Sequence, residues 1–92
     1  MPTDDEKIII NRIQKYLKLI GDENRKNIKI ILICNLFIYL NENTDFINSY
    51  PRFKNTVINK YNQLKSEIYD KSVNENVRNR YITISNKLFN SL

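Results

Sequence analysis

Few side chains in this sequence could carry out catalysis or bind a metal ion. The chain has no histidine, the most common general base and metal ligand, and its one glycine is too few for a glycine-rich phosphate loop. Its single cysteine, Cys34, stands in an apolar segment, where a thiol usually behaves as a small inert hydrophobic group. The sequence therefore predicts that the protein is not an enzyme and uses no cofactor, no metal and no small-molecule substrate.

Three consecutive acidic residues near the N-terminus, Asp4, Asp5 and Glu6, form the one cluster that could hold a cation. They follow Thr3, and the spacing of Thr3 and Glu6 is that of a capping box, in which each side chain accepts a hydrogen bond from the backbone of the other. Acidic residues also stabilise the positive end of a helix dipole. We therefore interpret this cluster as the start of a helix rather than as a metal site.

The net charge of +5 is unevenly distributed along the chain. Residues 1–50 contain seven basic and seven acidic residues, whereas residues 51–92 contain eight basic and three acidic residues. A basic half is typical of many proteins that bind nucleic acid, and the tyrosines could supply stacking surfaces. The residues that would contact phosphates are Arg52, Lys54, Arg78, Arg80 and Lys87.

The lysines of the helix expected after Pro51 favour a simpler interpretation of this charge. Lys54, Lys60 and Lys65 flank the apolar stripe of that helix, and its outward face carries mainly neutral polar residues. Lysines at such positions lay their stems along the core and keep their charges in water. The basic residues therefore have two explanations: a surface that is only solvated, or a nucleic-acid-binding surface. We keep nucleic-acid binding as the alternative function.

Residues 28–40 are the most apolar segment of the chain, and Asn35 is its one plainly polar residue after Lys29. A helix of this sequence is apolar on nearly every side and must be surrounded by other helices or by lipid. The segment is shorter than the roughly 20 apolar residues that span a bilayer, so we expect no membrane insertion. We predict a central helix covered on all sides by amphipathic neighbours. Asn35 would then bond to a neighbouring polar group, lie at a gap between helices, or set the register against a partner.

The remaining segments carry apolar residues at helical spacing, separated by capping residues. We expect Asp22 to cap the second helix, Asn43 or Thr44 to cap a short third helix, and Ser72, in a capping box with Glu75, to cap the last one. The helices should cover residues 4–20, 23–40, 44–49 and 51–70, with a fifth helix from residue 73 onward. The sequence thus predicts an all-α fold in one domain over residues 1–92. This fold is a compact bundle of four main helices plus one short helix, with the apolar second helix at the centre.

Some apolar residues lie off the main stripes of their helices. Ile82 and Phe89 of the last helix stand on a separate face, and the first helix carries apolar residues on both flanks of its stripe. These residues either contact the short third helix or form a surface that another chain covers. We therefore predict a small protein-interaction or structural module, acting as a homo-oligomer or as a component of a larger assembly, with Arg78, Ile82 and Phe89 at its interface. A small inhibitor or antitoxin-like protein would show the same features.

The composition also bears on origin and location. Ile, Asn, Lys and Tyr account for half of the residues, and all four have AT-rich codons. This indicates an AT-rich genome, as in many large DNA viruses, so a viral protein is one interpretation. A lone cysteine excludes an internal disulfide, and the acidic start lacks the apolar core of a signal peptide, so we expect an intracellular location.

Overall fold

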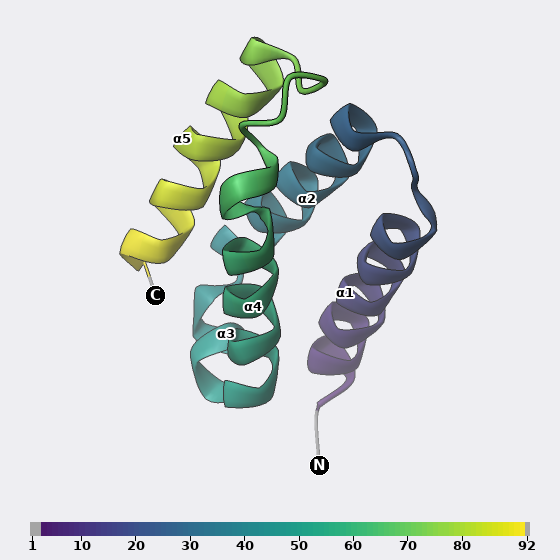
Figure 1. The fold of residues 1–92 in the computed structure, drawn as a ribbon. Coiled ribbons are helices and arrows are strands. Elements are labelled where there is room, and N and C mark those ends of the chain that lie inside the picture. Colours follow the sequence, from purple (N-terminus) through teal and green to yellow (C-terminus); the bar gives the residue numbers. More distant parts are fainter. Residues whose placement is uncertain (1–2, 92) are drawn as a thin grey trace.

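The computed structural model describes residues 3–91, and within them the chain forms five α-helices and no β-strand (Figure 1). The prediction of a small all-α bundle is confirmed. The helices are α1 (Asp4–Asp22), α2 (Lys26–Asn41), α3 (Thr44–Ser49), α4 (Pro51–Glu67) and α5 (Glu75–Ser91). None of these helices is both long enough and apolar enough to cross a membrane.

Helix α2 lies at the centre, between α1 on one side and α5 on the other (Figure 1). α1 runs antiparallel to α2, as expected for helices joined by a short loop. α5 instead runs parallel to α2, because α3 and α4 return the chain to the end of the bundle at which α2 begins. At that end the carboxamide of Asn27 donates to the Ser72 carbonyl at 2.9 Å and accepts from the Asn74 amide at 2.7 Å.

The core is built around the apolar residues of α2. Phe37 is fully buried, and its ring centroid lies 5.9 Å from that of Tyr81 and 6.0 Å from that of Phe89, both on α5. The other helices each contribute buried side chains to the same cluster. The buried residues of α2 are Ile30, Ile33, Cys34, Leu36, Phe37 and Leu40.

One edge of α2 is exposed to solvent, so the prediction that neighbours cover this helix on all sides is wrong. Ile31 is 40% exposed, and Asn35, one turn further on, is also exposed. α1 and α5 lie on opposite flanks of α2, and α4 lies in front of it (Figure 1). The exposed Ile31 and Asn35 mark the side of α2 that these helices leave open. Asn35 therefore lies at a gap between helices, as one of our interpretations expected.

The helix ends follow the predicted caps in part. The capping box of Thr3 and Glu6 is present: the Glu6 amide donates to Thr3 Oγ1 at 3.2 Å, and the Thr3 amide donates to Glu6 Oε1 at 3.4 Å. α3 begins after Asn43 and ends at Ser49, close to the prediction, whereas α4 ends at Glu67, a turn earlier than expected.

Two predicted caps are wrong. Asp22 is the last residue of α1 rather than the cap of α2, because residues 23–25 form the connection and α2 begins only at Lys26. Ser72 does not cap α5, since its hydroxyl donates to Asp70 Oδ1 at 2.7 Å. Asn74 takes the capping position instead, and its side-chain oxygen accepts from the Asn76 amide at 2.8 Å.

Candidate interaction surfaces

Cys34 and Glu6, which carry groups that could take part in chemistry, are held in contacts that stabilise the fold. Cys34 is fully buried, and this burial raises the pKa of its thiol to about 11, although the nearby Arg80 cation acts in the opposite direction. The Glu6 carboxylate accepts hydrogen bonds from the Tyr50 hydroxyl and from the Thr3 amide. These two hydrogen bonds lower the pKa of Glu6. Among residues 3–91, no three Cys, Asp or Glu side chains are grouped closely enough to hold a metal ion. The surfaces of the bundle are therefore its candidate functional features.

The predicted interface residue Arg78 contacts the end of α4. Its Nε donates to the backbone carbonyl of Ile68 at 2.7 Å, and its guanidinium lies over the Tyr69 ring, 5.5 Å from the centroid. Arg78 is half-buried in this position. Its charged group therefore joins α5 to the segment that follows α4.

Phe89 and Ile82 face the same seam between α4 and α5. Phe89 is half-buried, with its ring centroid 4.6 Å from that of Tyr61 on α4. Ile82 is also half-buried and lines a hollow of about 270 Å³ at the seam. The other lining residues are Tyr61, Lys65, Ile68, Tyr69, Tyr81, Ser85 and Asn86. Much of the apolar area predicted for an interface is thus in contact with α4, and Tyr69, 65% exposed, is the most exposed part of this seam.

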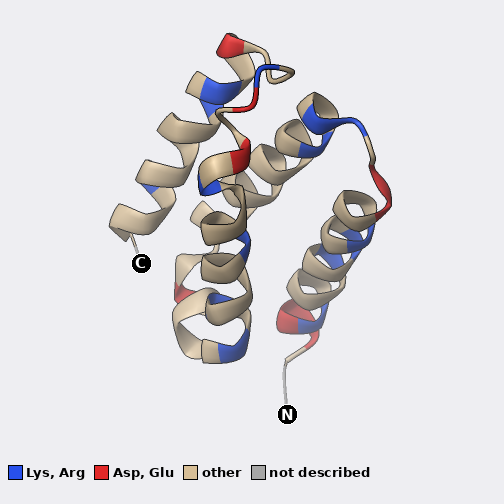
Figure 2. Cartoon of the chain, in the orientation of Figure 1, with Lys and Arg blue, Asp and Glu red and all other residues tan. Residues whose placement is uncertain are grey.

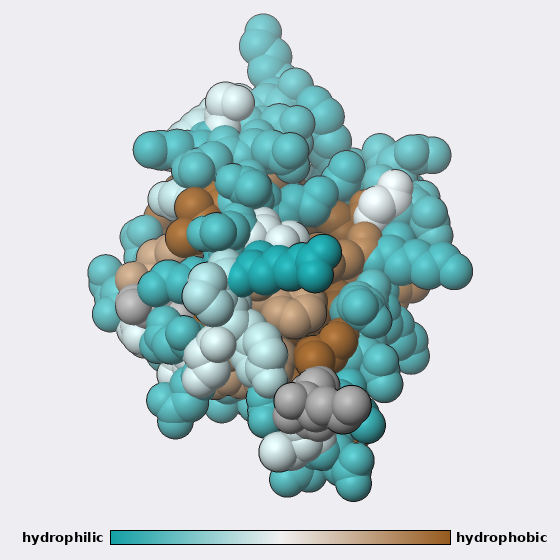
Figure 3. Space-filling view, turned by 90° about the horizontal axis from the view of Figure 1, so that it is seen from below, coloured by the Kyte–Doolittle hydropathy of each residue, from teal (hydrophilic) through white to brown (hydrophobic). Residues whose placement is uncertain are grey.

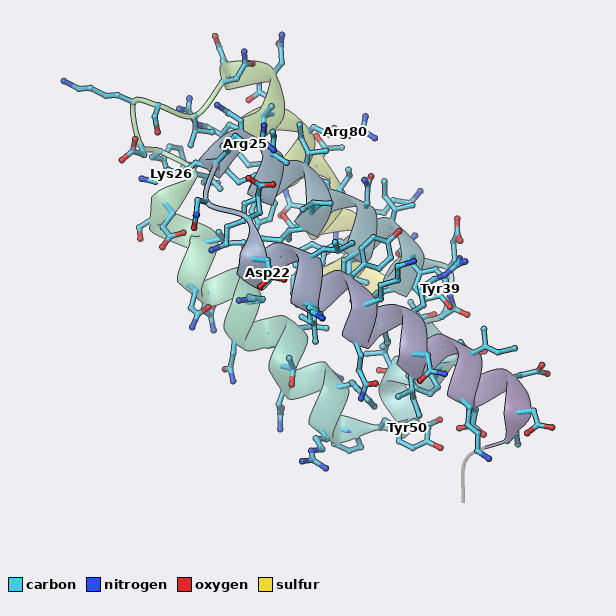
Figure 4. The ribbon with its side chains drawn as sticks, turned by 90° about the vertical axis from the view of Figure 1, so that its right-hand side faces the viewer. Asp22, Arg25, Lys26, Tyr39, Tyr50 and Arg80 are labelled. Atoms are coloured by element: carbon cyan, nitrogen blue, oxygen red, sulfur yellow. The ribbon has the colours of Figure 1, made fainter. Side chains whose placement is uncertain are left out.

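The five basic residues predicted for nucleic-acid contact do not form one patch. Arg52 and Lys54 lie in the first turn of α4, beside α3, where Lys54 Nζ is 3.4 Å from Asn48 Oδ1. Arg78 is engaged at the opposite end of α4. Arg80 projects from the side of the molecule away from α4 (Figure 4). Lys87, seven residues later, is exposed and lines a hollow with Ile84 of α5 and Ile38 of α2. The basic residues are thus spread over several helices (Figure 2).

This side, opposite α4, carries a second surface that the sequence analysis did not identify. We call it the cationic face; it is formed by Ile8, Arg12, Lys15 and Leu19 of α1, Ile31, Asn35 and Ile38 of α2, and Arg80, Ile84 and Lys87 of α5. The exposed edge of α2 is its middle line, and α1 and α5 are its two flanks (Figure 1).

Contacts between the helices join parts of this face. On the α1 side, the Arg12 guanidinium lies over the Tyr39 ring of α2 at 5.2 Å, and the Tyr16 and Tyr39 centroids are 6.5 Å apart. Next to them is a hollow of about 330 Å³, lined by Arg12, Lys15, Tyr16 and Leu19. On the α5 side is a second hollow, of about 190 Å³, lined by Ile38, Asn41, Glu42, Ile84 and Lys87. The exposed edge of α2 thus lies between two hollows.

The cationic face combines unpaired positive charge with exposed apolar side chains. None of its four cations, Arg12, Lys15, Arg80 and Lys87, forms an ion pair with a described residue. Three of the most exposed large apolar residues of the described chain lie among them: Ile8 is 61% exposed, Leu19 46% and Ile31 40%. Figure 3 shows the lower end of the bundle rather than this face; apolar groups are visible there between hydrophilic side chains.

Parts of this face had signals in the sequence. Ile8 and Leu19 lie on one of the two flanks that widen the apolar stripe of the first helix, and Arg80 and Lys87 are two helical turns apart. Ile31 had no such signal, because in a segment that is apolar throughout, the periodicity does not show which side is exposed. Only the packing of α1 and α5 on α2 brings the three parts together.

No protein-family model matches this chain, and neither does a curated protein or a solved structure.

Proposed function

We propose that this protein is a non-enzymatic helical module that acts by binding another protein chain through its cationic face. The observation that carries the proposal is the exposure of three large apolar side chains, Ile8, Leu19 and Ile31, on that face. Single exposed apolar residues are normal on any soluble protein, whereas several of them on one face, among polar residues, favour an interaction site. The module would act as a component of a larger assembly, or with a second copy of itself.

The seam around Ile82 supports a second, smaller contact site. Its hollow could receive one side chain of a partner, and Tyr69 offers an exposed ring beside it. Arg78 and Phe89 would support this site through their contacts with Tyr69 and Tyr61 rather than by touching a partner directly. We therefore keep the interface predicted around Arg78, Ile82 and Phe89 as a secondary proposal.

Substitution of the middle of the cationic face tests the main proposal. Ile31→Glu places a charge at the exposed edge of α2, and Asn59→Glu places the same side chain on the outer face of α4, as a matched control. We expect both variants to keep the helical circular dichroism spectrum of the wild type. Proteins retained from cells that express the chain should then be lost with Ile31→Glu and kept with Asn59→Glu.

Light scattering over a range of concentrations examines the case in which the partner is a second copy. A mass that rises with concentration for the wild type and Asn59→Glu, but not for Ile31→Glu, would support self-association through this face. Two results together would contradict the proposed function: the wild-type chain is monomeric at all concentrations, and the wild type, Ile31→Glu and Asn59→Glu all retain the same proteins from cells.

Nucleic-acid binding is the alternative, and the four unpaired cations beside Tyr16 and Tyr39 are the observation that favours it. Such a complex should weaken steeply with salt, because each neutralised phosphate releases counterions. A gel-shift series from low to moderate salt that shows no complex with duplex or single-stranded oligonucleotides would exclude it. The apolar groups within the face are not needed to bind phosphates, so we place protein binding first.

A further inference from the structure

The chemistry of the cationic face indicates which class of protein it would bind. We infer that it binds an acidic amphipathic helix of a partner protein, whose apolar side lies along the exposed edge of α2. This inference rests on the proposed function and adds to it the charge and the secondary structure of the partner.

The shape of the molecule favours a helix as the ligand. The Cα positions extend over 44 × 28 × 18 Å, so the bundle is a flat body about two helices thick. α1, α2 and α5 lie side by side, and α4 lies in front of α2 and next to α5 (Figure 1). Packed helices are roughly 8–10 Å apart, so the axes of α1 and α5 lie roughly 16–20 Å apart across α2, enough to flank one further helix.

The apolar residues of the face have the arrangement that receives a helix. Ile31 and Ile38 are seven residues apart on α2, with Asn35 between them, and Leu19 and Ile84 stand on the two flanks. A bound helix would place apolar side chains at three- and four-residue spacing over this line, as in other helix-in-groove complexes. The hollows on either side of the line could each take a larger side chain.

The charges of the face determine which helix would fit. None of its four cations forms an ion pair within the described chain, and Glu42, at the end of α2, is the one carboxylate among the residues that line its two hollows. Complementary charge guides association and disfavours the wrong partners. A second copy of the same face would bring like charges together, so the partner should instead carry acidic residues on both sides of its apolar stripe.

Selection from a displayed library of amphipathic helical peptides, unbiased in charge, tests the inference with the full-length chain as the target. The double variant Lys15→Glu/Lys87→Glu reverses two exposed charges on the face, and Lys18→Glu/Arg52→Glu reverses two exposed charges elsewhere. We expect the enriched peptides to be acidic. Their dissociation constants should rise at least about tenfold with the first double variant and change by less than about twofold with the second. Ile31→Glu should also abolish binding.

Other results would overturn the inference in distinguishable ways. If the enriched peptides are neutral or basic and bind both double variants equally, the partner is not an acidic helix. The proposed function would still stand if Ile31→Glu abolishes the binding of these peptides. Peptides that are insensitive to Ile31→Glu, or no enrichment at all, would contradict the inference, and the retention experiment with Ile31→Glu then decides the proposed function separately. The chain could instead bind no peptide but bind oligonucleotides, or vesicles of phosphatidylcholine and phosphatidylserine, in a way that depends on Lys15 and Lys87. The anion that the face binds would then be a nucleic acid or a lipid headgroup, and the inference would be wrong.

Discussion

Arg78 and Ile68 close a loop of the chain: the Nε of Arg78 donates to the backbone carbonyl of Ile68, ten residues earlier, at 2.7 Å. This carbonyl follows the last residue of α4, where backbone acceptors have no partner within the helix. A positive charge at such a position satisfies the acceptor and also interacts favourably with the helix dipole. The same guanidinium also lies over the Tyr69 ring, 5.5 Å from its centroid.

Replacement of Arg78 should therefore destabilise the fold. We expect Arg78→Met to lower the free energy of unfolding by about 1–2 kcal/mol, since a half-buried hydrogen bond from a charged donor and a cation–π contact are lost together. Arg78→Lys should fall between the wild type and Met. Urea denaturation followed by circular dichroism measures this, with the exposed Arg80→Met as the control. Equal stability of Arg78→Met and Arg80→Met would mean that the contact contributes nothing.

Removal of one hydroxyl group should stabilise the core. The Tyr81 hydroxyl is buried without a hydrogen-bond partner in the described chain, and burial raises the pKa of this group. An unsatisfied buried hydroxyl costs about 1–3 kcal/mol, so we expect Tyr81→Phe to raise the free energy of unfolding by about 1 kcal/mol. Tyr61→Phe, on the neighbouring stacked ring, should have little effect. A loss of stability in Tyr81→Phe would instead indicate that the hydroxyl bonds to a buried water molecule.

The thiol of Cys34 should be unreactive in the folded protein. It is fully buried, and its pKa is raised to about 11, so very little thiolate is present near neutral pH. We expect a disulfide reagent to label the native protein only as fast as the core opens, and to label it rapidly in urea. The amplitude in urea serves as the control for total thiol. Rapid labelling under native conditions would contradict the packing of α5 over α2.

Asp70 should make the protein sensitive to acid. Its pKa is well below the usual carboxyl value because its carboxylate accepts from the Ser72 hydroxyl at 2.7 Å and the Ser72 amide at 2.9 Å, and pairs with Lys26 at 2.9 Å. The unfolded chain therefore binds this proton at a higher pH than the folded chain does. The stabilising contribution is complete above the ordinary carboxyl pKa and is lost as the pH falls toward the folded value.

Asp70→Asn tests this prediction through the pH dependence of stability. The melting temperature of the wild type should fall between about pH 5 and pH 2 more steeply than that of Asp70→Asn. Asp45→Asn, at an exposed site outside both ion pairs, is the control for the loss of one carboxylate. Parallel curves for the wild type and Asp70→Asn would contradict the role of Asp70.

Local signals in the sequence were sufficient to predict the helices. The capping box of Thr3 and the proline at position 51 mark the starts of α1 and α4, and the apolar stripes identify the buried sides of both. The signals at Asp22 and Ser72 failed, because several residues near each loop can serve as caps and the tertiary contacts select among them. Ser72, for example, is taken up by Asp70 and by Asn27.

Which surfaces are left exposed could not be predicted in the same way. Phe89 lies off the main stripe of α5 because this helix contacts two neighbours, α2 through Phe37 and α4 through Tyr61. The sequence alone does not distinguish such a second internal face from an external one. Conversely, the exposed edge of α2 depends on how many helices pack around it and at what positions, which is a property of the assembled bundle rather than of residues 28–40.

The parallel arrangement of α2 and α5 has a consequence for how the chain reaches its fold. Asn27 and Asn74, which meet where these helices begin, are 47 residues apart in sequence, so a long loop must close before the largest apolar surface is covered. Until the residues after Glu75 have been synthesised and have docked, the face of α2 around Phe37 can adhere to other incomplete chains. The yield of folded protein should therefore depend on how crowded the growing chains are, and slower or more dilute synthesis should favour it.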